Sequence, residues 1–162
     1  MDVSRYQHSE SIRIKRSAAD LYAIVSDLTR MGELSPVCTS CTWDDTAQAA
    51  KEGAWFTGHN VVDDFEWDTR SRVISADPGR DFTFITCGQK GDGDYVQWGY
   101  AFEERDGETT VTESWKLLPA YSGFIAADNP GADVKAHIEG MAAMARDGIR
   151  DTLANLKRVA ET

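Results

Sequence analysis

The stretch YVQWGYAFEERDGETTVTESWKLL, residues 95–118, alternates between apolar and polar side chains on both sides of Asp106-Gly107. Alternation with a period of two is typical of a half-buried β-strand, and an Asp-Gly pair is a strong hairpin signal. The stretch therefore predicts two antiparallel strands. The side chains predicted to share their inner face are Val96, Trp98, Tyr100, Phe102, Val111, Glu113, Trp115 and Leu117.

The same period of two continues upstream to Val37, with turn signals at Asp63-Asp64 and Pro78-Gly79. Residues 8–15 alternate in the same way and predict one more strand before this region. Because the connections from 37 to 119 are short, we expect consecutive strands to pair as an antiparallel meander.

Helical spacing appears in two places. Ser17 is a good N-cap, and the apolar residues after it predict two short helices that end before Pro36. The stretch AYSGFIAADNPGAD, residues 120–133, is expected to be irregular. Within it, Asn129-Pro130 resembles an N-cap and first helical residue, so we expect a long helix from there to about Ala160. The apolar stripe predicted for the long helix is Val134, Ile138, Met141, Ala145, Ile149, Thr152, Leu153 and Leu156.

These elements predict one α+β domain over residues 1–162. A curved seven-stranded antiparallel sheet would wrap around the long C-terminal helix, with the two short helices between the first and second strands. A strongly bent sheet cannot contact a helix closely everywhere, so we expect a cavity between them.

The composition narrows the possible partners. The formal net charge is -10, and an acidic surface repels phosphate backbones, so nucleic acid is not an expected partner. No apolar run approaches the ~20 residues of a membrane span, and the first residues lack the apolar core of a secretion signal. We therefore expect a cytoplasmic protein without stable membrane insertion. No nucleotide, metal or cofactor motif is present, so no cofactor and no metal are expected.

The order of these elements and several local motifs resemble the START-like superfamily, also called SRPBCC, which has the helix-grip fold. The chain is most similar to its bacterial polyketide cyclase/dehydrase-type members. The matching segments are RMGELSP (30–36), GAWFTGHN (53–60), WDTRSRVISADPGRDFTF (67–84), WGYAFEERDGETTVTESWKL (98–117) and GMAAMARDGIRDTLANLKRVAE (140–161).

The resemblance implies an internal hydrophobic cavity that binds lipids, polyketides, sterols or similar molecules. It does not imply one chemistry, because this fold serves carriers, cyclases and regulators. Three hypotheses follow: a protein that binds a hydrophobic small molecule, a cyclase or dehydratase, and a non-catalytic interaction module. The last could be a homodimer that uses residues 119–130.

Glu113 is the candidate catalytic residue. Strand parity places it on the inner face, where loss of hydration would raise its pKa and suit it to acid/base work. The alternative is a structural position, either in an ion pair with an arginine such as Arg70 or Arg72 or at a strand end where Glu113 reaches water, and both roles stay open. The predicted ligand-binding residues are Phe56, Asn60, Trp67, Phe84, Trp98, Tyr100, Trp115, Ile138, Met141, Met144 and Ala145.

Cys38 and Cys41 form a C-x-x-C motif on a predicted strand. In a regular strand, residues three apart point to opposite faces and lie about 10 Å apart. No helix follows to make a thioredoxin-type site, and zinc would need Cys87 and His59 as further ligands. We therefore expect two thiols that are not linked.

Overall fold

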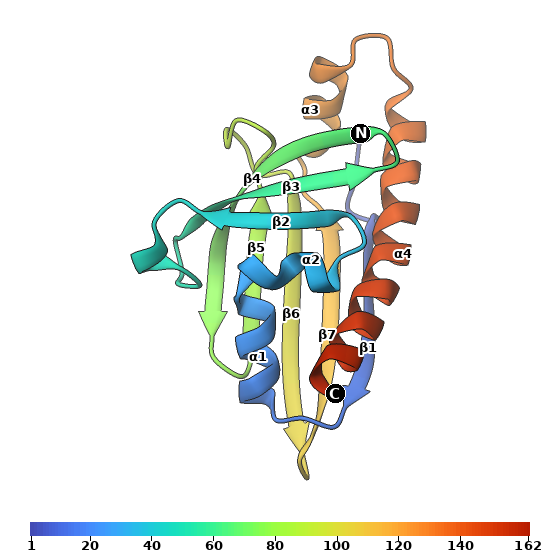
Figure 1. Ribbon diagram of the computed structural model, residues 1–162. Helices are drawn as coiled ribbons and strands as arrows, with labels where there is room; N and C mark the ends of the chain where they lie inside the picture. Colours follow the sequence, from blue (N-terminus) through green and yellow to red (C-terminus); the bar gives the residue numbers. More distant parts are fainter.

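The computed structural model describes residues 1–162 as a curved sheet, a long helix on its inner side and short helices at its edges (Figure 1). In chain order the elements are β1 (Gln7–Ile14), α1 (Ala18–Ser26), η1 (Leu28–Arg30), α2 (Met31–Leu34), β2 (Cys38–Trp43), η2 (Thr46–Gln48), β3 (Trp55–Val62), β4 (Phe65–Asp77), β5 (Asp81–Thr86), β6 (Val96–Arg105), β7 (Glu108–Leu117), α3 (Tyr121–Asp128) and α4 (Val134–Ala160).

The sheet has seven strands in the order β1-β7-β6-β5-β4-β3-β2, and every neighbouring pair is antiparallel. The predicted meander and helix-grip fold are therefore confirmed. Asp106 and Gly107 at the β6–β7 turn have φ angles of 55° and 79°. A tight hairpin turn needs this left-handed backbone at both central positions, which explains the Asp-Gly pair.

Helix α1 begins where the sequence predicts. The Ser17 side chain accepts a hydrogen bond from the backbone N–H of Asp20 at 3.1 Å. This bond satisfies one of the amide groups that have no partner inside the helix. Leu21 and Val25 then point into the core, where both are fully buried.

Helix α4 begins later than expected. Its N-cap is Asp133, whose side chain accepts a hydrogen bond from Ala136 N–H at 3.1 Å. The expected start at Asn129-Pro130 was wrong, because Asn129 is the residue that ends α3. Gly131 follows with a φ of 83°, a left-handed conformation that no α-helix contains.

The stretch expected to be irregular, residues 120–133, contains helix α3 from Tyr121 to Asp128. Tyr121 and Ile125 are buried, and the ring of Phe124 stacks on Tyr95 with centroids 4.2 Å apart. This segment therefore covers an edge of the chain's own core, which leaves it little apolar surface for a second subunit.

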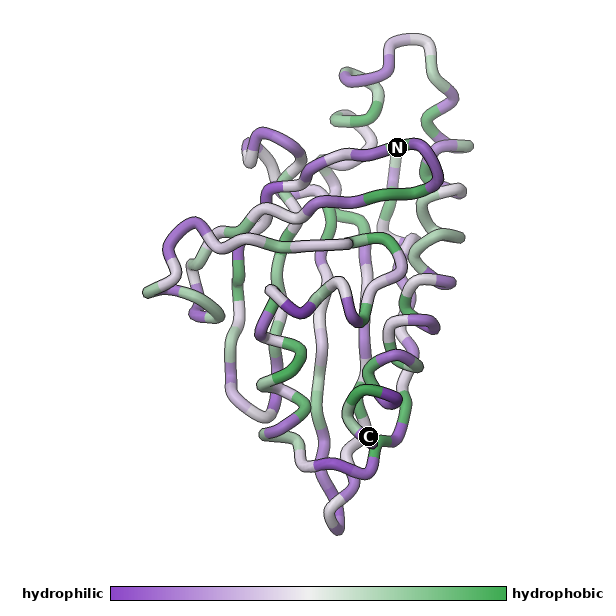
Figure 2. The backbone as a smooth tube through the Cα atoms, in the orientation of Figure 1, coloured by the Kyte–Doolittle hydropathy of each residue, from purple (hydrophilic) through white to green (hydrophobic).

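Helix α4 lies along the sheet with its hydrophobic side inward, and Figure 2 shows hydrophobic and hydrophilic residues alternating along it. Ile138, Ile149 and Leu156 are fully buried in the core. Isolated helices are marginally stable in water, so this burial is what holds α4 in place. None of the helices is both long and apolar enough to cross a membrane.

Helix α2 packs closely against β2 at Thr39. A Cβ atom placed on Gly32 would lie 2.3 Å from the carbonyl oxygen of Thr39, closer than any non-bonded contact allows. Thr39 is also where the pairing of β2 with β3 shifts, because Cys38 is paired with Asn60 and Ser40 with His59. Gly32 thus permits a β-bulge to lie directly under α2.

The Gly32→Ala variant tests this contact. Alanine normally favours a helix over glycine, but here its methyl group would push α2 away from Thr39. We expect a loss of about 1–3 kcal/mol in the free energy of unfolding, measured by urea denaturation. Gly123→Ala in α3 is the control, because a Cβ there meets nothing within 4 Å. A neutral or stabilising effect of Gly32→Ala would contradict the interpretation.

Candidate functional site

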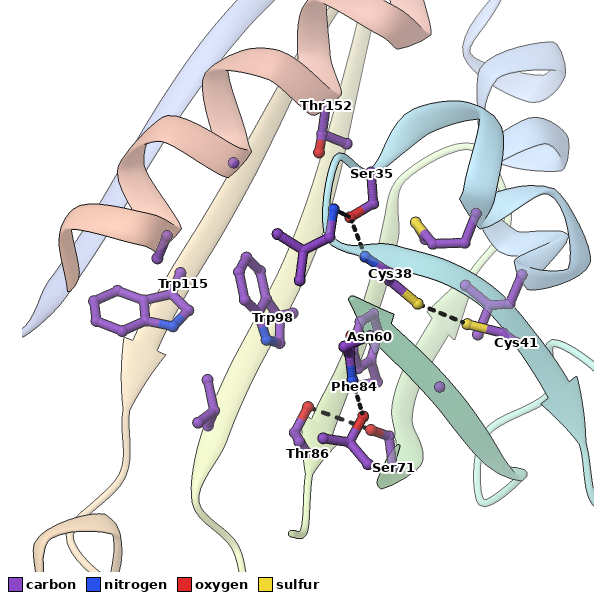
Figure 3. A pocket seen from close by; sticks show the side chains of 18 of the residues that line it. Ser35, Cys38, Cys41, Asn60, Ser71, Phe84, Thr86, Trp98, Trp115 and Thr152 are labelled. Atoms are coloured by element: carbon purple, nitrogen blue, oxygen red, sulfur yellow. Dashed lines mark hydrogen bonds between the residues drawn. The ribbon is translucent and has the colours of Figure 1, made fainter. Parts of the chain in front are cut away.

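A cavity of about 180 Å³ lies between the sheet and α4, and hydrophobic side chains dominate its wall. Figure 3 shows Trp98 and Trp115 on one side of it and Cys38 and Cys41 of β2 on the other. The predicted site residues that line it are Phe56, Asn60, Trp67, Phe84, Trp98, Tyr100, Glu113, Trp115, Met141, Met144 and Ala145. Ile138 is instead fully buried in the core and is not part of the wall.

One face of α4 forms the helical side of the cavity. Met141, Met144, Ala145, Gly148 and Thr152 contribute to the wall. Their spacing of three and four residues places them in one row, beside the row that packs into the core. A Cβ atom on Gly148 would meet nothing within 4 Å, so this glycine widens the cavity rather than allowing close approach to the sheet.

Glu113 is buried in the wall, with only 3 % of its surface exposed. It shares the inner face of β7 with Val111 and Trp115, as strand parity predicts. The pKa of the Glu113 carboxyl is raised to about 8, and burial is the main cause. The negative charge of Glu10, its partner on β1, also raises this pKa. Hydrogen bonding from Tyr100, directly opposite on β6, acts in the other direction and lowers it. The carboxyl group is therefore mostly protonated at neutral pH.

The alternative role for Glu113, an ion pair with Arg70 or Arg72, is wrong. Arg70 binds Asp44 through two hydrogen bonds of 2.6 and 2.7 Å. Arg72 binds both carboxylate oxygens of Asp94. Both guanidinium groups are thus engaged by acidic residues outside the cavity, and no cation neutralises Glu113.

Two buried polar atoms of the cavity wall have no hydrogen-bond partner. They are Oε1 of Glu113 and Nε1 of Trp115. These residues are two apart on β7 and therefore point to the same face. A buried polar group without a partner is destabilising by about 1–3 kcal/mol, so the pair is suited to an oxygen atom supplied by a ligand.

Asn60 faces inward, as its prediction as a ligand-binding residue requires, and its neighbour His59 faces outward. The Asn60 side chain is 9 % exposed and donates hydrogen bonds to the carbonyl oxygen of Trp67 at 3.2 Å and to the Thr69 hydroxyl at 3.4 Å. Its amide nitrogen thus ties β3 to β4. His59 Nδ1 lies 2.6 Å from Asp68 on the outer face.

Cys38 and Cys41 are not linked, as expected, but their expected separation on opposite faces of the strand was wrong. The Sγ atoms of Cys38 and Cys41 lie 3.4 Å apart, and both residues line the cavity. The β-bulge at Thr39 reverses the strand parity between them, so they point to the same face. Strand spacing alone does not reveal a bulge.

Several wall residues were missed by the sequence analysis. Leu28, Met31, Ser35 and Val37 come from the segment that precedes β2, and Ser71 and Thr86 from β4 and β5. The small polar residues carry no pattern that separates them from solvent-facing positions. Met31 and Ser35 had a signal, because both belong to the segment RMGELSP that carries the family resemblance.

The pH dependence of stability tests the burial of Glu113. Its folded pKa of about 8 lies above the unfolded value of about 4.5, so the folded state holds a proton that the unfolded state releases. The stabilising proton is fully present below pH 4.5, and stability falls as pH rises to 8. We expect wild type to lose on the order of a few kcal/mol across this window, since one pKa unit is about 1.4 kcal/mol.

Glu113→Gln should flatten this dependence, because the amide does not titrate and has nearly the same shape. Urea denaturation between pH 5 and 9 gives the unfolding free energies. Glu10→Gln is the matched control and should keep most of the wild-type slope, since burial is the largest cause of the shift. Parallel curves for wild type and Glu113→Gln would refute the elevated pKa.

Comparison with known proteins shows which family this chain resembles in sequence and structure. Residues 6–161 match the family described as polyketide cyclase / dehydrase and lipid transport. The polyketide-cyclase-like protein Cgl2372 from Corynebacterium glutamicum is 38 % identical, and the match covers 99 % of this chain and 94 % of that one with a TM-score of 0.70. No curated protein matches the chain.

More distant structures share the fold. A START superfamily protein from Mycobacterium smegmatis is 12 % identical, with a TM-score of 0.67 and coverage of 96 % of this chain and 97 % of that one. The di-domain ARO/CYC protein StfQ of the steffimycin biosynthetic pathway is also 12 % identical, with a TM-score of 0.68; the match covers 96 % of this chain and 50 % of StfQ. The chain, which has the helix-grip fold, thus belongs to the polyketide cyclase/dehydrase and lipid transport family.

Proposed function

We propose that this protein binds a hydrophobic small molecule with at least one oxygen substituent in the cavity between its sheet and α4. The observation that carries the proposal is the pairing of an apolar wall with two unpartnered buried polar atoms, Glu113 Oε1 and Trp115 Nε1. Ligand sites are typically apolar with a few placed polar groups.

The polar pair sets the chemistry of the ligand. A protonated carboxyl group donates one hydrogen bond and accepts others, and the indole N–H only donates. A hydroxyl or carbonyl oxygen placed between them would satisfy both atoms. A carboxylate ligand is disfavoured by the acidic surface, which carries a formal net charge of -10.

The size of the cavity limits what fits without rearrangement. Its volume of about 180 Å³ is slightly larger than a cavity of about 150 Å³ that holds benzene in another protein. A compact molecule of one or two rings is therefore favoured. Met31, Met141 and Met144 line the wall, and their flexible side chains allow it to adapt to a longer polyketide or lipid.

The family supports this proposal at a general level. Its description includes both cyclisation and lipid transport, and each requires a hydrophobic molecule inside the protein. A cytoplasmic location and a homodimer stay predictions.

Filling the cavity tests the proposal. Gly148→Leu should place a side chain in the space that the glycine leaves open and weaken binding of 2-naphthol at least tenfold, measured by isothermal titration calorimetry. Because leucine favours a helix over glycine, Gly148→Leu should also raise the free energy of unfolding by about 0.5–1 kcal/mol. Loss of binding would then not reflect unfolding.

Gly140→Leu is the matched control, since Gly140 is exposed on the same helix and a Cβ there also meets nothing within 4 Å. It should bind 2-naphthol as wild type does. Naphthalene tests the polar pair, because it lacks the hydroxyl group and should bind about tenfold more weakly. No binding of either compound to wild type, or equal binding to both glycine variants, would refute the proposed site.

Catalysis of the cyclase or dehydratase type is a second candidate function, favoured by the Glu113 carboxyl itself. A group with a pKa of about 8 can exchange a proton near neutral pH, and Tyr100 lies directly opposite it. Aldol closure and water loss both need removal of a proton next to a carbonyl group. Glu113 would be the acid/base, and Tyr100 or Asn60 would orient the substrate oxygen.

Proton exchange on 1-tetralone, a bicyclic ketone, tests this role without knowledge of the substrate. Wild type should accelerate uptake of deuterium next to the carbonyl group at least tenfold over buffer, followed by mass spectrometry in heavy water. Glu113→Gln should bind the ketone within threefold of wild type but lose the acceleration. Equal exchange rates for the two proteins would remove Glu113 from the chemistry.

A further inference from the structure

The two cysteines of β2 form a contact that ligand binding does not require. Their Sγ atoms are 3.4 Å apart, and Figure 3 shows the two thiol groups pointing toward each other. Both residues are only partly buried, so small water-soluble reagents can reach them. The third cysteine, Cys87, is fully buried and lies beside Arg72.

The β-bulge gives the pair a separation that suits a covalent bond. Cys38 is paired with Asn60 and Cys41 with Gly58, and these partners are only two residues apart on β3. Two residues of strand correspond to a Cα separation of about 6.6 Å. Disulfides span Cα distances of about 4.4–6.8 Å, so only a small movement is needed.

Gly58 leaves room for both sulfur atoms over β3. A Cβ atom on Gly58 would lie 3.5 Å from the Sγ of Cys38 and 3.8 Å from that of Cys41. Because Gly58 has no side chain, the two sulfur atoms can meet above it. The backbone of Cys38 is also fixed, since its N–H donates a hydrogen bond to Ser35 Oγ at 2.9 Å.

The contact makes the two thiols chemically unequal. A hydrogen bond from the Cys41 thiol lowers the pKa of Cys38, and the same bond raises the pKa of Cys41. Cys38 is therefore the better nucleophile, and Cys41 is placed to react second. Burial raises the pKa of Cys87, which makes that thiol less reactive.

We propose that Cys38 and Cys41 form a reversible dithiol–disulfide pair in the cavity wall, oxidised by peroxides. The Cys38 thiolate attacks one peroxide oxygen and breaks the O–O bond, which gives a sulfenic acid and, after protonation of the leaving hydroxide, one water. The Cys41 sulfur then attacks the Cys38 sulfur, its proton joins the departing hydroxide, and a second water leaves. Two thiols are oxidised and one hydrogen peroxide is reduced to two waters.

Mass spectrometry of the intact protein tests the proposal. Reduced wild type treated with hydrogen peroxide should lose the mass of two hydrogen atoms, remain a single chain and keep one reactive thiol after unfolding, at Cys87. Dithiothreitol should restore the original mass. The experiment needs no ligand, so its outcome is independent of the proposed binding function.

Three variants distinguish this pair from general oxidation. Cys87→Ser should form the disulfide as wild type does. Cys41→Ser should gain oxygen at Cys38 instead, because no second thiol resolves the sulfenic acid, and Cys38→Ser should react at least tenfold more slowly. Oxygen uptake by wild type without a mass loss, a disulfide only between two chains, or survival of all three thiols would overturn the proposal.

Discussion

The structure depends on the contact between one long helix and a curved sheet. Helix α4 is held by apolar residues such as Ile138 and Ile149, which are fully buried against the strands. Figure 1 shows α4 lying along the curved sheet. In the neighbouring row of α4, a Cβ atom on Gly148 would meet nothing within 4 Å, so the strands are not in close contact at that point. Gly148 and Ala145 are small residues in that second row, and the cavity lies beside them. The fold therefore combines close packing of the helix on the sheet, which stabilises the protein, with an adjacent cavity.

Glu113 shows that this space is maintained at a cost in stability. An apolar residue at the same place would pack without loss of hydration, and no arginine offsets the buried carboxyl group. Trp115 beside it also leaves its indole N–H unpaired. Both groups lie on β7, an interior strand of the sheet, where pairing with β1 and β6 on either side holds them in position. Unsatisfied polar groups on a rigid strand are typical of a site organised for something other than stability.

Strand periodicity predicted most of the fold and the inner face of the central strands, because side chains alternate strictly where pairing is regular. It identified Glu113, Trp98 and Tyr100 for this reason. The prediction that Ile138 lines the cavity was wrong for a different reason. The helical spacing of the apolar residues in α4 does not tell which of them face a cavity and which face the core. The start of α4 was misjudged because Asn129-Pro130 has the composition of a helix start, whereas the preceding helix determines the role of Asn129.

The largest failure of periodicity, at Cys38 and Cys41, has a physical cause in the tertiary structure. The extra residue Thr39 shifts the register of β2, and its carbonyl oxygen lies where only a glycine at position 32 leaves space. The bulge is thus supported by α2, an element whose packing strand alternation does not describe. Because β2 is an edge strand, it tolerates the shift without disturbing the rest of the sheet. Strand spacing did not predict that the two thiols lie close together, because the β-bulge is not visible in the sequence. The same bulge brings both thiols into the cavity wall, so the chemistry of this wall depends on the packing of α2 as well as on β2.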